Sequence, residues 1–70
     1  MNKEIEKIVQ SRQEKNRELL KQLEDCVNKY STMRFGQILE VFGFLSDDPF
    51  AEESYKTLER VNNKTRSINY

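Results

Sequence analysis

The sequence predicts an all-α protein, in which a long N-terminal helix is followed by a two-helix hairpin and dimerisation completes the bundle. Three observations support this class. Residues 2–30 contain no glycine or proline, apolar side chains recur at spacings of three and four, and a stop-and-restart signal separates two short apolar segments. We expect one helical domain over residues 1–62 and a flexible tail over 63–70.

The first predicted helix covers about residues 2–30 and is rich in the straight-chain residues that favour helices. Its apolar stripe is interrupted, because residues 10–18 contain no apolar side chain and Arg12 and Asn16 occupy stripe positions. This polar middle fits a solvated stretch, a break near Ser11, or a polar layer in a helix pair that fixes register and partner. The apolar residues on either side are Ile5, Ile8 and Val9, then Leu19, Leu20, Leu23, Cys26, Val27 and Tyr30.

The second predicted helix covers about residues 33–45, with Ser31 or Thr32 as its N-terminal cap. Gly36 and Gly43 lie seven residues apart in it. They either form a smooth strip for a neighbouring helix, or Gly43 ends the helix. The predicted core contains Phe35, Ile38, Leu39 and Phe42 from this helix, packed against Leu20, Leu23, Val27, Leu58 and Val61.

The third predicted helix covers about residues 49–61. Asp47 or Asp48 is the expected cap, Pro49 suits the first turn, and Glu52 and Glu53 lie near the positive end of the helix dipole. The inner face of this helix would contain Phe50, Ser54, Leu58 and Val61, with Tyr55 at its edge. The following segment, NNKTRSINY, has no periodic pattern, so we expect a frayed tail.

The composition argues against an enzyme or a metal site. The chain has no histidine and a single cysteine, Cys26, so an internal disulfide and the usual zinc ligand sets are absent and no imidazole exists to activate a nucleophile. Capping explains part of the acidic cluster around residues 47–53. We therefore expect no catalytic residues, no metal and no cofactor. The N-terminus lacks a signal-peptide stretch and no run is long enough for a membrane helix, so we expect a cytoplasmic protein without membrane contact.

Charge balance also bears on the partner. Twelve lysines and arginines face twelve acidic residues in the whole chain, and residues 1–34 carry eight positive and six negative groups. Domains that neutralise several phosphates are usually much more one-sided. A small dimeric DNA-binding regulator is therefore the alternative interpretation, and a protein partner is the favoured one.

Helix lengths predict an uncovered surface. The first helix would extend about 42 Å, roughly twice the length of each of the others. The hairpin would cover the adjoining half, Leu19 to Tyr30, and leave the N-terminal apolar residues for a second copy. Arg34 either contacts a partner or pairs with Asp48 or Glu52. The side chains expected at a dimer or partner interface are Ile5, Ile8, Val9, Arg12, Asn16, Arg34, Gln37, Phe44 and Tyr55.

Residues 30–61 resemble a family of short, mostly uncharacterised proteins from bacterial phages, prophages and other mobile elements. The resemblance rests on Met33-Arg34-Phe35-Gly36-Gln37-Ile38-Leu39, Asp48-Pro49-Phe50, Glu52-Glu53-Ser54, Thr57-Leu58 and Arg60-Val61. It implies a genomic setting and no catalytic residue or cofactor. We expect a non-enzymatic module in the bacterial cytoplasm that binds itself and a host or phage protein, as an inhibitor or regulator of a host defence or housekeeping complex. A virion or scaffold component is a third class.

Overall fold

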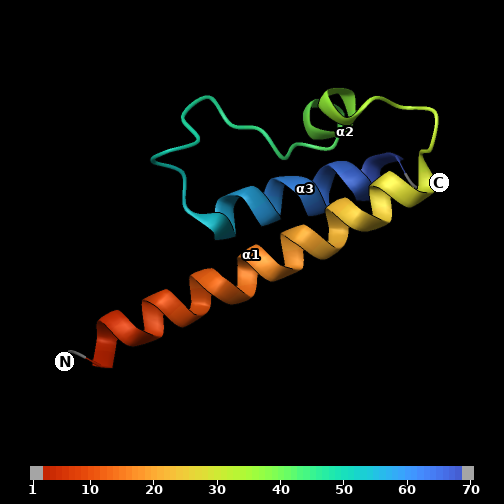
Figure 1. Ribbon diagram of the computed structural model, residues 1–70. Coiled ribbons are helices and arrows are strands. Elements are labelled where there is room, and N and C mark those ends of the chain that lie inside the picture. Colours follow the sequence, from red (N-terminus) through yellow and green to blue (C-terminus); the bar gives the residue numbers. More distant parts are fainter. Residues whose placement is uncertain (1–2, 69–70) are drawn as a thin grey trace.

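The computed structural model describes residues 3–68, and all of its regular elements over that range are helices (Figure 1). The elements are α1 (Lys3–Lys29), α2 (Phe35–Val41) and α3 (Ser54–Ile68). A long N-terminal helix followed by shorter helices is thus confirmed. Both short helices pack on α1, and an extended connection joins them.

Helix α1 is continuous through Ser11. Its 27 residues give a length of about 40 Å, and its straight-chain residues keep the polar middle helical. The proposed break near Ser11 is therefore wrong, and the polar middle of α1 is a regular helix surface.

Helix α3 lies beside α1 and runs in the same direction (Figure 1). The order of the contacts shows this, because Glu53 meets Arg12 while Asn62 meets Gln22 further along both helices. Because α3 runs parallel to α1, the chain must first return along α1 before α3 can begin. Residues 30–53, including α2, make this return, so α3 starts opposite the middle of α1 and leaves its N-terminal part uncovered.

The core lies where the three helices meet. Its buried side chains are Cys26, Ile38, Phe42, Leu58 and Val61. The partly buried side chains that pack against Cys26, Ile38 and Phe42 are Leu23, Tyr30, Met33 and Phe44. The rings of Tyr30 and Phe42 are 4.9 Å apart between centroids, within the range of favourable aromatic pairs.

Three predicted core residues are exposed instead. Leu20 is 67% exposed, Phe35 is 57% exposed and Val27 is 40% exposed. Leu20 lies one position outside the α1 stripe that faces α3, and Phe35 is the first residue of α2, ahead of the turn that buries Ile38 and Phe42. Val27 lies one position after the buried Cys26. Membership of an apolar cluster in the sequence was therefore insufficient to predict burial for these three.

Helix α2 begins later than predicted. Ser31 and Thr32 lie in a turn closed by the Met33 N–H, which donates to the Tyr30 carbonyl at 3.0 Å. Arg34 is the N-cap residue, and its N–H donates to the Gln37 side-chain oxygen at 2.9 Å. The predicted hydroxyl cap is wrong, because the chain is still turning away from α1 at these residues.

Gly43 ends α2. It has φ +81, its N–H donates to the Glu40 carbonyl, and the Phe44 N–H donates to the Leu39 carbonyl at 2.9 Å. This is the glycine-terminated helix end in which a left-handed residue satisfies the last carbonyls. A methyl group added at Gly36 would meet nothing within 4 Å, so no helix of the described chain packs against a strip formed by the two glycines.

Helix α3 begins at Ser54, five residues after the predicted start at Pro49. Asp48 closes a separate turn, since its carbonyl accepts from the N–H groups of Ala51 and Glu52 and its side chain accepts from Ala51 at 3.3 Å. The Glu53 carbonyl then accepts the first bonds of the helix.

The C-terminal boundary also differs from the prediction. Helix α3 continues to Ile68, so residues 63–68 are helical where a flexible tail was expected, and residues 69–70 lie outside the described part. Asn62 bonds to Gln22 at 2.7 Å, which holds this part of α3 on α1. Tertiary contact therefore stabilises a segment whose own sequence pattern is weak.

Candidate functional site

Polar side chains from the middle of α1 meet the start and centre of α3. We call this contact the polar seam. Arg12 donates to Glu53 through two bonds, Nε to Oε1 at 2.9 Å and Nη2 to Oε2 at 2.8 Å. The other pairs of the seam are Ser54 to Asn16 and Gln22 to Asn62. Arg12 and Asn16, the two polar residues at stripe positions, thus contact the start of a helix of the same chain while both remain exposed.

The polar seam fixes how α3 sits on α1. Hydrogen bonding from Arg12 lowers the pKa of the Glu53 carboxyl, and the same pair raises the pKa of Arg12. Both side chains are about half exposed, and solvent weakens such pairs. The seam therefore specifies the start of α3 more than it stabilises the fold, and Arg12 and Asn16 are engaged within the chain.

A second polar cluster, which we call the Arg60 anchor, ties the connecting segment to α3. The Arg60 guanidinium donates to the Gly43 carbonyl at 2.7 Å and to both carboxylate oxygens of Glu52, at 2.9 and 2.6 Å. Thr57 donates to Glu52 at 2.6 Å. Hydrogen bonds from Arg60 and then from Thr57 lower the pKa of Glu52 from 4.5 to about 2.

Sequence reasoning missed the Arg60 anchor. Glu52 and Arg60 are eight residues apart, and Glu52 precedes the helix, so the pair does not have the three- or four-residue spacing that marks helical neighbours. The alternative in which Arg34 pairs with Asp48 or Glu52 is wrong, because Arg60 binds Glu52 and Asp48 closes its own turn.

The N-terminal part of α1 extends beyond α3 (Figure 1). It presents Ile5 at 59%, Ile8 at 56% and Val9 at 42% exposure. The structure thus places these three predicted interface residues on an uncovered helix surface, as the helix lengths implied. Nothing in the described chain buries them.

A groove lies where this exposed part of α1 meets the start of α3. We call it the N-terminal groove; its lining is Lys7, Ile8, Ser11, Arg12, Lys15, Glu53, Ser54 and Tyr55. Ile8 and Tyr55 supply apolar surface. Arg12 and Glu53 neutralise each other, so Lys7 and Lys15 leave the groove with a positive charge.

The outer face of α2 forms a separate surface at the far end of the molecule. Arg34, Gln37 and Val41 share it by their spacing of three and four, and Phe35 lies at its border. Val41 is 44% exposed. Within residues 3–68 no ion pair involves Arg34, so its guanidinium is available to an outside acceptor, whereas Gln37 also caps the helix.

Phe44 does not belong to either surface. It follows the Gly43 turn and packs, partly buried, against Cys26, Ile38 and Phe42. The prediction that it contacts a partner is therefore not supported by its position, because the left-handed turn at Gly43 directs the chain back to the core.

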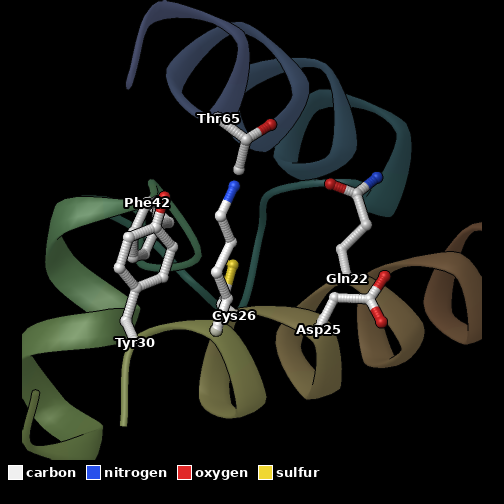
Figure 2. Close-up of a pocket in the computed structure, with 7 residues that line it drawn as sticks. Gln22, Asp25, Cys26, Tyr30, Phe42 and Thr65 are labelled. Carbon is white, nitrogen blue, oxygen red and sulfur yellow. The ribbon is translucent and has the colours of Figure 1, made fainter. Parts of the chain in front are cut away.

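A cleft of about 190 Å³ lies between α1, α3 and the end of α2. Figure 2 shows Tyr30 and Phe42 together at one end, Gln22 and Asp25 at the other, and Cys26 between them. Burial raises the pKa of the Cys26 thiol. A protonated, buried thiol is a small apolar core residue and a poor nucleophile.

Within residues 3–68, no three cysteine or acidic side chains gather in an arrangement that would hold a metal ion. None of the described helices combines the length and the apolar character needed to cross a membrane. These features define the described part of the chain as an all-helical arrangement in which polar anchors fix the helices and apolar side chains remain exposed at both ends. No protein family, curated protein or solved structure matches the chain.

Proposed function

We propose that this protein is a non-enzymatic binding module that docks on another protein through the outer face of α2. The observation that carries the proposal is the division of side chains on this helix. Ile38 and Phe42 are buried, while Phe35 and Val41 remain exposed on the helix that Arg34 begins as the N-cap residue. Apolar surface next to an arginine is typical of the centre of protein interfaces.

The target we propose is a host or phage protein in the bacterial cytoplasm. The support is the resemblance of residues 30–61 to phage and mobile-element proteins, since α2 lies within that segment. A small phage protein without a catalytic motif often acts by occupying a surface of a larger machine. We therefore propose an inhibitor or regulator of a host defence or housekeeping complex.

The test is capture of the target from a bacterial lysate, followed by binding measurements with the purified target. Arg34→Glu and Phe35→Ser should each weaken binding by about tenfold or more, as for other central interface residues. Phe50→Ser is the matched control, because this phenylalanine is exposed on a different surface and should leave binding unchanged.

Two results would contradict the proposal. If Arg34→Glu and Phe35→Ser bind as well as the unmodified protein, α2 is not the docking surface. If the protein instead binds duplex DNA with an affinity that falls steeply with salt, the regulator alternative is correct. Circular dichroism of each variant checks that the helices are intact.

A further inference from the structure

Phe50 is the most exposed apolar side chain in the described part of the chain, at 100%. It was predicted to lie on the inner face of the third helix. The turn that carries it is well fixed, because Pro49 restricts the backbone and Asp48 accepts bonds from Ala51 and Glu52. The Arg60 anchor then holds Glu52. A phenyl ring displayed on a fixed turn is prepared for binding, since little freedom is lost when it is covered.

The Phe50 turn is also acidic. Asp47 and Asp48 precede it and are both exposed. The charge of Asp47 acts on Arg60, but Glu52 and the Gly43 carbonyl already occupy the guanidinium of that arginine. Lys56 lines the same hollow as Asp47 and Asp48 and offsets one of their two charges. The turn therefore offers an aromatic side chain beside a net negative charge.

The N-terminal groove has the complementary character. Its apolar lining is Ile8 and Tyr55, and its positive charge comes from Lys7 and Lys15. These lysines are eight residues apart on α1, which places them about 12 Å apart along the helix axis, with Ile8 between them. An aromatic ring with flanking carboxylates matches the apolar lining and the positive charge of this groove.

The turn and the groove belong to the same end of the molecule (Figure 1). Phe50 lies just before Ser54 and Tyr55 in sequence, yet its full exposure shows that it does not enter the groove of its own chain. Two adjacent complementary surfaces on one protein satisfy the requirement of a two-fold dimer, in which each copy supplies both halves of the contact.

We propose that two copies of the protein form a two-fold dimer in which Phe50 of each copy enters the N-terminal groove of the other, beside Lys7 and Lys15. The two-fold axis produces this contact twice, and each phenylalanine side chain buries about 150–250 Å². Pairing of α1 with α1 alone offers less, because the described part of the uncovered segment presents aliphatic side chains and no aromatic ring. This dimer goes beyond the proposed function and uses a different surface from α2.

The test is sedimentation equilibrium of the purified full chain from low to high micromolar concentration. The unmodified protein should shift from the 8.4 kDa monomer towards the dimer, and added salt should weaken the association. Phe50→Ser, and separately Lys7→Glu with Lys15→Glu, should weaken it about tenfold or more. The matched controls are Phe35→Ser, and Arg17→Glu with Lys21→Glu, which lie outside the groove and should dimerise normally.

A mixing experiment shows whether the occupant is a second copy. The Phe50→Ser variant keeps its groove, and the Lys7→Glu, Lys15→Glu variant keeps its turn. A mixture of the two can form one of the two contacts, so it should associate more strongly than either variant alone.

Three results would overturn the proposal. If the protein stays monomeric over the whole concentration range, a second copy does not occupy the groove and its partner is a different molecule. A Phe50→Ser variant that dimerises normally, while Ile5→Asp does not, assigns the dimer to α1 pairing. A mixture no more associated than its components removes the reciprocal contact. The target-binding assay is independent of all three, because the α2 face is intact in these variants.

Discussion

Three phenylalanines in this chain allow the same substitution to be compared at three depths. Phe42 is 1% exposed and contacts the Tyr30 ring, Phe44 is partly buried against the same cluster, and Phe50 is fully exposed. If burial determines their contribution to the free energy of unfolding, truncation to alanine should give a graded series.

The magnitudes follow from burial. Phe42→Ala removes a buried ring and should cost about 3–5 kcal/mol, a large share of the stability of so small a domain. Phe44→Ala should cost about 1–2 kcal/mol, because part of its ring is already in water. Phe50→Ala should change the monomer by less than about 0.5 kcal/mol.

Thermal unfolding followed by circular dichroism is the appropriate assay. It should be carried out at concentrations low enough to keep the chain monomeric, so that a lost dimer contact is not counted. For a domain of this size about 1 kcal/mol corresponds to 4–8 °C in Tm, so Phe42→Ala should lower Tm by more than about 12 °C. A Phe50→Ala variant that melts as early as Phe42→Ala, or a neutral Phe44→Ala, would refute the arrangement of the core and of the Gly43 turn.

Two further predictions concern the end of α2 and the Arg60 anchor. Gly43→Ala should destabilise the protein by about 1 kcal/mol or more in urea unfolding, because φ is +81 and the added carbon would lie 3.0 Å from the Arg60 side chain. Gly36→Ala has open space around it and should stabilise the protein by up to about 1 kcal/mol. Equal effects at both positions would contradict this account. The folded state lowers the pKa of Glu52 from 4.5 to about 2, so its contribution is present above pH 4.5 and is lost as the pH falls towards 2. In an acid-unfolding profile, Arg60→Gln should therefore lose less stability between pH 4.5 and pH 2 than the unmodified protein. An unchanged profile would show that the Arg60 anchor does not contribute to this loss of stability.

Local and periodic information determined the parts of the fold that were predicted correctly. A long run of helix formers is enough for α1, and the spacing of apolar residues identified Ile38, Phe42, Leu58 and Val61 as core. The helix end at Gly43 was one of two interpretations, and the sequence alone did not choose between them. The uncovered N-terminal surface followed from helix lengths alone.

Contacts between distant residues decided the rest. The start of α3 depends on Glu53 meeting Arg12, which is 41 residues away in sequence, so the capping signal at Asp48 and Pro49 formed a separate turn instead. That displacement moved Phe50 from the predicted inner face of the third helix to full exposure and directed Glu52 to Arg60. The parallel course of α3 likewise converted the polar middle of α1 from a predicted partner surface into an internal seam. Helical propensity acts over a few residues, whereas the position of a helix on its neighbour is fixed by side chains that the sequence alone does not bring together.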